Sequence, residues 1–443
     1  MTTDVPSFVL RVEQNAHLAV GARTVHAILE VSAVDPRAAA GGPPPDAAEV
    51  IIIDRSGSMS GRKMKQALLA AAAAVDVLRD GVFFAIVAGQ SSAQVVYPAE
   101  PVMVRASERT RAEAKRALRG VTTAGGTSMS TWLTLAELLL STCPAPLKHA
   151  IMLTDGQNTE GTALLTGALS TCAGRFVCDC RGVGDDWSLT QLKEIAGALL
   201  GSWKPIASPD QLSDDFRSLM AASMRKRVSG VTLRVRPNRA ATLTHLARVL
   251  PSIEELTDKG VPVQEGRAFE FPLGSWGVEE RAYDLRLDLA QQDLNIENDT
   301  QGRAARVEVL VPSADGGSAV VAGESVLVAW STDAALSGLI NEAVAGYSGQ
   351  EELAQVVNRA VQAWDEQASD VGVLLGRAVA LAHRLGRDDL LEQLSRMAFI
   401  EDPAAGLVRP RPRGEVERGV LHQSSWLSEQ SSAIGERQNG RQR

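Results

Sequence analysis

A run of aliphatic residues that ends abruptly in a polar turn limits the possible folds of this chain more than any other feature. Val50 to Ile53 is a short β-branched block, which is typical of a parallel strand buried on both faces. The next five residues, Asp54-Arg-Ser-Gly-Ser58, set a carboxylate and two hydroxyls two residues apart in a glycine-containing turn. A helical stripe follows at once, with apolar residues at Met64, Ala67, Leu68, Ala71, Val75 and Leu78. Strand, polar loop and helix in this order predict an open α/β sheet with a site at the carboxyl ends of its strands.

The region around this stretch alternates strand and helix patterns from residue 46 to residue 225. Apolar strands are predicted at 82–88, 92–97, 148–153, 176–183 and 203–206, with helical patterns between them. Repeated βα units joined by short loops predict a doubly wound, mostly parallel sheet of the Rossmann-like type. We therefore assign residues 46–225 to one α/β domain.

The rest of the chain has different patterns on either side of this domain. Residues 226–331 alternate apolar and polar positions between turn-rich loops, which predicts an antiparallel β-sandwich. Residues 1–45 hold two strand patterns and a Gly/Pro-rich linker, and we expect these strands to complete the sandwich, so that the α/β domain is an insertion. Residues 332–410 are helical by periodicity, and residues 411–443, rich in Arg and Ser, are predicted to be a disordered tail.

The composition restricts the functions that the chain can have. A net charge of −8 and a pI near 5.5 argue against broad binding to nucleic acids or to anionic membranes. The first residues, MTTDVPSF, show no secretory signal, and the longest apolar run is too short to span a bilayer. The four cysteines lack the paired spacing of a zinc site and are expected to be reduced, buried thiols. These features predict a cytoplasmic protein without membrane insertion.

Two further polar stretches belong to the same predicted sheet. Thr122-Thr-Ala-Gly-Gly-Thr127 precedes a helix, and its two glycines allow the backbone to approach a site closely. Leu153-Thr-Asp155-Gly156 ends a buried strand with a carboxylate. With these motifs the chain resembles the von Willebrand factor A (VWA) family, and the resemblance covers about residues 47 to 225. It also resembles bacterial multi-domain VWA proteins, in which a β-sandwich and a helical region follow.

The resemblance implies an intact metal-ion-dependent adhesion site made of Asp54, Ser56, Ser58, Thr127 and Asp155. In the family pattern the two serines coordinate the cation directly, the threonine does so in the ligand-competent state, and the aspartates act directly or through water. Magnesium is the expected ion, with manganese or calcium as alternatives, because hard cations take oxygen ligands. The partner implied by the family is a protein that offers an Asp or Glu to the metal.

Other interpretations of these residues remain open at this point. Asp54, Ser56 and Ser58 could instead cap a helix and fix a turn. A protein-binding scaffold or adaptor is the main functional hypothesis, and the alternative is a VWA partner subunit of an AAA+ ATPase of the MoxR or chelatase type. A metal-dependent hydrolase is a third possibility, but the chain has no Walker A, Gly-x-Ser-x-Gly or His-Glu-x-x-His motif. We therefore expect that the protein is not an enzyme.

Overall fold

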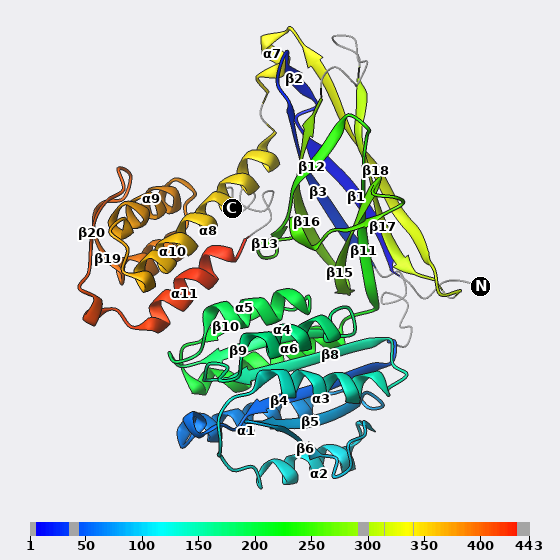
Figure 1. Cartoon of the computed structure of the whole chain (residues 1–443), viewed down its shortest axis with the longest axis vertical. Helices are drawn as coiled ribbons and strands as arrows, with labels where there is room; N and C mark the ends of the chain where they lie inside the picture. The colour runs from blue at the N-terminus through cyan, green and yellow to red at the C-terminus, as the bar shows by residue number, and fades with distance from the viewer. Residues whose placement is uncertain (1–5, 35–43, 291–300, 314, 340, 432–443) are drawn as a thin grey trace, which may run out of the picture. The chain divides into compact units, whose positions relative to one another are not determined.

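The computed structural model describes residues 6–34, 44–290, 301–313, 315–339 and 341–431 (Figure 1). The described residues divide into two compact units. The α/β unit draws on Asp35–Gly230 with Gly274–Val278, and the sandwich–helix unit draws on Pro6–Val34, Val231–Leu273 and Glu279–Arg443. Residues 35–43 of the predicted linker and residues 432–443 of the predicted tail lie outside the described residues.

The α/β unit is built on one sheet with the strand order β10-β9-β8-β4-β5-β6. All neighbours in this order pair in parallel except β6, which pairs antiparallel with β5 at the edge. The sheet therefore confirms the predicted doubly wound, mostly parallel fold. Its strands are β4 (Ala47–Asp54), β5 (Phe83–Gly89), β6 (Ala93–Tyr97), β8 (Leu147–Thr154), β9 (Val177–Val183) and β10 (Trp203–Ile206), and β7 (Val104–Arg105) pairs with β5.

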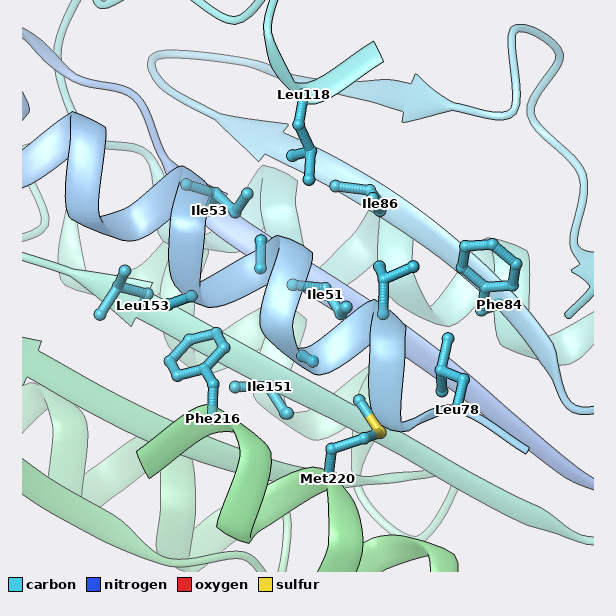
Figure 2. Close-up of a cluster of buried hydrophobic side chains, with 14 of the residues drawn as sticks. Ile51, Ile53, Leu78, Phe84, Ile86, Leu118, Ile151, Leu153, Phe216 and Met220 are labelled. Atoms are coloured by element: carbon cyan, nitrogen blue, oxygen red, sulfur yellow. The ribbon is translucent and has the colours of Figure 1, made fainter. Parts of the chain in front are cut away.

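Helices cover both faces of this sheet because the central strand β4 is apolar on both faces. Ile51 and Ile53 pack into one core with α1 (Arg62–Val77), α2 (Glu108–Leu118) and α6 (Leu212–Met224). Figure 2 shows Phe216 of α6 beside Leu153 and Ile151 of β8, which belong to the same core. Val50 and Ile52 point into the opposite core, which contains side chains of α3 (Met129–Ser141), α4 (Thr162–Cys172) and α5 (Leu189–Ala198). Successive side chains of β4 point to opposite faces of the sheet, so this one strand contributes apolar residues to both cores.

A buried ionic chain crosses three neighbouring strands near their amino ends. His149 of β8 lies between two carboxylates, with Nδ1 2.6 Å from Glu49 of β4 and Nε2 2.9 Å from Asp179 of β9. Burial alone would lower the pKa of His149, but the Glu49 charge and the hydrogen bonds to both carboxylates raise it to about 10. Burial would raise the pKa of Asp179, and the hydrogen bond from His149 instead holds it well below its usual range. His149 is therefore a charged link between β4 and β9.

The sandwich–helix unit contains two sheets that lie face to face (Figure 1), with the strand orders β1-β3-β16-β12-β13 and β14-β15-β11-β17-β18-β2. Val25 and Leu29 of the first sheet and Leu233 and Val235 of the second are fully buried. Strand β3 pairs antiparallel with β16, so the N-terminal strands complete the sandwich and the α/β unit is inserted into it. The bounds are β1 (Ser7–Gln14), β2 (His17–Ala19), β3 (Thr24–Val34), β11 (Val228–Pro237), β12 (Ala241–Leu250), β13 (Glu254–Glu255), β14 (Val261–Val263), β15 (Ala268–Trp276), β16 (Glu279–Leu289), β17 (Gly302–Pro312) and β18 (Ser318–Ser331).

The C-terminal part of this unit is mainly helical, but residues 398–410, which were expected to belong to the helical region, form a β-hairpin. It contains α7 (Ala334–Ser337), α8 (Glu342–Glu366), α9 (Val371–Arg384) and α10 (Asp388–Ser395), followed by a hairpin of β19 (Ala398–Asp402) and β20 (Leu407–Pro410). None of the described helices combines the length and apolar content that a bilayer crossing requires.

Helix α11 (Arg418–Glu429) corrects the prediction that residues 411–443 form a disordered tail. Its Leu421, Ser424 and Ser425 are buried. The Ser425 hydroxyl donates to Asn358 of α8, and Ser424 donates to Val420 O one turn back. Small hydroxyl residues pack closely against a neighbouring helix, so a segment with little apolar content still forms a buried face.

Candidate metal centre

The first part of the candidate site is the carboxylate at the end of β4. Asp54 is completely buried, and its Oδ1 accepts a hydrogen bond of 2.7 Å from the backbone N–H of Ser56. Its Oδ2 accepts a 2.6 Å hydrogen bond from the Thr154 hydroxyl, at the end of the neighbouring strand β8. Both bonds hold the Asp54 carboxylate at the carboxyl edge of the parallel sheet, where we expected a site.

The two serines after Asp54 connect it to a second buried carboxylate. The Ser58 hydroxyl donates to Asp155 Oδ1 at 2.7 Å, and the Ser56 hydroxyl lies 3.0 Å from the Ser58 hydroxyl. Because the single hydroxyl proton of Ser58 is donated to Asp155, Ser56 is the donor to Ser58. The other oxygen of Asp155, Oδ2, accepts a 2.6 Å bond from the ammonium group of Lys63 on α1.

The glycine loop before α3 brings in the fifth predicted residue. The Gly57 N–H donates to Gly125 O at 3.0 Å, and the Ala124 N–H donates to Arg55 O at 2.8 Å, so two loops distant in sequence are joined through their backbones. Gly125 has a φ of +74°, which favours glycine. Thr127, 3% exposed, follows this loop.

The glycine after Asp155 marks the point on which these oxygens converge. A Cβ atom at Gly156 would lie 3.3 Å from Thr127 Oγ1, 3.5 Å from Ser58 Oγ and 4.0 Å from Asp54 Oδ2. The structure thus brings all five predicted residues, from three separate loops, to one position. Ser56 precedes the short helix 57–59 and Gly61 precedes α1, and neither residue makes a side-chain cap bond. Hydrogen bonds instead link the Asp54 carboxylate with both serines, so a simple helix cap does not account for the arrangement.

The charges and oxygen types of this cluster fit a hard divalent cation. Burial raises the pKa of Asp54, and the charge of Asp155 adds to this rise, while hydrogen bonds from Thr154 and Ser56 oppose it. Two buried aspartates and three hydroxyls are oxygen donors, which magnesium, manganese and calcium prefer. Such an ion would stabilise the charged form of both carboxylates.

Residues that the sequence did not indicate hold the loops of the site together. Thr159 Oγ1 donates to Thr127 O at 2.8 Å, and Asn158 Oδ1 accepts from the backbone N–H of Met129 at 3.0 Å. The Gln191 side chain of α5 accepts from the Asn158 N–H at 3.0 Å. Asn158, Thr159 and Lys63 follow the motif residues closely in sequence, but no pattern marks them, and Gln191 is 33 residues beyond Asn158. Only the three-dimensional arrangement therefore reveals their part in the site.

Comparisons with known proteins agree with this arrangement. A family model described as the von Willebrand factor type A domain matches residues 48–204. A solved structure described as von Willebrand factor type A from Catenulispora acidiphila is 35% identical, with a TM-score of 0.89, and the match covers 97% of this chain and 98% of that one. No curated protein sequence matches the chain.

Two more distant structures share the fold alone. The ArnB paralog VWA2 from Sulfolobus acidocaldarius is 14% identical with a TM-score of 0.60, over 96% of this chain and 100% of that one. A human COPII-coat protein is 10% identical with a TM-score of 0.53, over 88% of this chain and 58% of that one. The similarity to the Catenulispora acidiphila protein extends over almost the whole of both chains, and with the family match it shows that this chain belongs to the von Willebrand factor type A family, whose domain is a metal-dependent adhesion and protein-interaction module.

Proposed function

We propose that the chain is a metal-dependent protein-binding module, a scaffold or adaptor that takes up an Asp or Glu side chain from a partner protein. The observation that carries this proposal is the convergence of Asp54, Ser56, Ser58, Thr127 and Asp155 beside Gly156. The hydroxyls of Ser56, Ser58 and Thr127 would hold a magnesium ion directly, and the two aspartates would act directly or through water. An ion held largely by neutral oxygens keeps positive charge that attracts a carboxylate.

The protein itself supplies the rigidity and the access that this function needs. Thr154 fixes the orientation of Asp54 through a 2.6 Å hydrogen bond, and the Ser58 hydroxyl holds Asp155 at 2.7 Å. Gly57, Ser58 and Gly125 are exposed, whereas both aspartates are fully buried. A partner carboxylate can therefore approach from the side of the serine and glycine loops while the aspartates stay shielded from solvent.

Calorimetric titration with magnesium tests the site assignment. We expect one magnesium ion to bind the wild-type protein, and Asp54→Ala and Asp155→Ala each to abolish binding, because each removes one of two buried negative charges. Asp214→Asn is the control, since the Asp214 side chain is 87% exposed and belongs to the same unit. Undiminished metal uptake in both alanine variants would refute the assignment.

Partner capture from a lysate, with and without a chelator, tests the role of the metal. We expect capture to depend on the divalent ion and to fail for Asp155→Ala. Identical capture in both conditions would reject metal-mediated recognition. Mass spectrometry of the captured protein also separates a general adaptor from a subunit of an AAA+ ATPase system, which is the alternative for the same site.

We also infer that the site binds rather than catalyses. The Asp54 carboxylate is occupied by hydrogen bonds from Ser56 and Thr154, and the Ser58 hydroxyl points its proton at Asp155. Incubation with generic phosphate and ester substrates in the presence of magnesium tests this inference. Turnover by the wild type that is lost in Asp54→Ala would show that the site is catalytic. The four free, buried cysteines support the proposed cytoplasmic location.

A further inference from the structure

A pocket on the sandwich is lined by four arginines. Arg236 and Arg239 come from the end of β11 and the turn after it, and Arg303 and Arg306 come from the first half of β17. The pocket has a volume of about 390 Å³, and its other lining residues are Pro237, Asn238 and Glu308. Four guanidinium groups around one carboxylate form an unusual concentration of positive charge in a chain whose net charge is −8.

The single carboxylate in this pocket does not neutralise the arginines. Glu308 lies 3.8 Å from Arg236 and 3.9 Å from Arg306, and it is also 3.5 Å from Arg234, which pairs more closely with Glu270. Arg239 and Arg303 have no ion-pair partner among the residues that the structure describes. Among the described residues that line the pocket, four arginines and one glutamate leave three formal positive charges.

The pairing of β11 with β17 places these charges close together, and this lowers the stability of the sheet. Arg236 and Arg306 are directly opposite each other in the antiparallel β11–β17 pair, a position where like charges destabilise a sheet. Glycine at position 323 makes room for one of them, because a Cβ atom there would lie 2.7 Å from Arg306 Nη2. The Nε atom of Arg236 is buried and has no hydrogen-bond partner within the described part of the chain. An anion between the arginines would relieve the repulsion and could satisfy unmet donors.

We propose that this pocket binds the phosphate groups of a ligand that carries at least two negative charges. Arginine presents a planar fork of N–H donors that matches phosphate oxygens bidentately and stays charged at all physiological pH values. The volume lies within the range of small-ligand pockets, which is roughly 300–1,000 Å³. The ligand is either a free phosphorylated small molecule or an anionic lipid headgroup, and both offer the same phosphate chemistry. This site is independent of the metal centre, since none of its residues belongs to the α/β unit.

Calorimetric titration of the full chain with inorganic pyrophosphate, after divalent ions have been removed on a chelating resin, tests the proposal. We expect saturable binding that weakens by about tenfold or more in the double variant Arg236→Gln/Arg306→Gln. Arg267→Gln is the matched control, because Arg267 is 74% exposed and outside the pocket. Asp54→Ala should bind pyrophosphate like the wild type, which separates a failure here from a failure of the proposed metal site.

A thermal-unfolding measurement distinguishes a binding role from a structural one. If the arginines serve binding, the double glutamine variant should be as stable as the wild type or more stable, because it removes a like-charge pair. No pyrophosphate binding by the wild type, equal binding by the double variant, or a clear loss of stability in that variant would overturn the proposal.

Vesicle sedimentation then separates the two sources of phosphate. Binding to vesicles that contain cardiolipin, whose headgroup carries two phosphates, but not to phosphatidylcholine vesicles, assigns a lipid headgroup if it is lost in the double variant. Pyrophosphate binding without vesicle binding assigns a soluble ligand. Binding to polyglutamate but not to pyrophosphate would assign an acidic protein segment and overturn the phosphate proposal.

Discussion

Lys63 is a positively charged residue beside a proposed cation site, so its role there is not evident from the sequence. Its ammonium group lies 2.6 Å from Asp155 Oδ2 and would compete with a divalent cation for that carboxylate. We expect Lys63→Met to bind magnesium about tenfold more tightly, which corresponds to roughly 1.4 kcal/mol, as measured by calorimetry. Lys65→Met, an exposed change on the same helix, should leave the affinity unchanged. Equal affinities for all three proteins would show that Lys63 does not oppose the ion.

Substitution of Gly156 gives a second test of the metal centre. An added methyl group would lie within 3.5 Å of Thr127 Oγ1 and Ser58 Oγ, at the point on which the site oxygens converge. We expect Gly156→Ala to weaken magnesium binding by about tenfold or more, because the methyl group displaces oxygens from the ion, with a change of stability below about 2 kcal/mol. Gly161→Ala is the matched control, since a Cβ atom there meets nothing within 4 Å. Titration of both variants with magnesium, alongside thermal unfolding, makes the comparison, and equal affinities would contradict it.

For individual residues, the sequence predicts where a side chain lies in the fold better than it predicts the hydrogen bonds that the side chain makes. The five motif residues lie together as expected, because each follows a strand or precedes a helix of one parallel sheet, and the ends of such strands meet at one edge. The Ser188 side chain caps α5 by accepting from the Gln191 N–H, and in a complete capping box the Gln191 side chain would bond back to the Ser188 N–H. The Gln191 side chain instead accepts a hydrogen bond from the Asn158 N–H. That choice depends on a loop more than 30 residues away in sequence, which no local pattern contains.

At the scale of elements, the ionic chain through β4, β8 and β9 gives the α/β unit a pH dependence. The folded pKa of His149, about 10, lies above its ordinary value of 6.5. Its stabilising effect is therefore complete below about pH 6.5 and is lost as the pH rises toward 10. The pKa of Asp179 is lowered, so its contribution is present above about pH 4 and is lost on acidification.

Urea unfolding of the wild type at pH 6, 8 and 9.5 checks this expectation. We expect the free energy of unfolding to fall with rising pH by an amount on the order of a few kcal/mol. His149→Gln should be less stable at pH 6 and should lose most of this slope, because two buried carboxylates remain without their cation. His383→Gln, at an exposed position, should keep the slope of the wild type. A wild-type stability that does not change between pH 6 and 9.5 would contradict the charged link.

Among the elements, β12 shows why some strands were missed. The alternation of apolar and polar residues that predicts strands over residues 226–331 is interrupted in β12. Its pairing with β16 shifts register between Leu243 and His245, so that Leu246 and Ala247 are both buried in succession. A β-bulge breaks the two-residue alternation on which strand prediction depends.

At the scale of the whole molecule, α11 ties the end of the described chain to the helices before it. Arg387, at the start of α10, donates to Leu427 O at 2.7 Å and to Gln430 O at 2.9 Å, and its guanidinium is paired with Asp389. These bonds satisfy carbonyl groups at the C-terminal end of α11, where a helix lacks internal partners. The order of this segment thus depends on a residue outside it.

Arg387→Ala should therefore destabilise the sandwich–helix unit by about 2–3 kcal/mol, because it removes charge-assisted bonds from a nearly buried side chain. Hydrogen exchange of residues 418–429 should become faster, while magnesium binding stays unchanged. Arg384→Ala is the control, since its side chain is 67% exposed and lies 3.9 Å from Glu352. Unchanged exchange in Arg387→Ala would show that α11 is held by other contacts.

The insertion of the α/β unit has a consequence for the order in which the protein folds during its synthesis. Strand β3 leaves the ribosome early, but its partner β16 begins only at Glu279. At about 5–20 residues per second, the intervening chain takes on the order of ten seconds to a minute to emerge. The inserted unit can fold in this time as a compact body, whereas one edge of β3 stays without its partner. An unpaired strand edge is a site of aggregation, so the nascent chain meets its greatest need for a chaperone between the completion of the inserted unit and the arrival of β16.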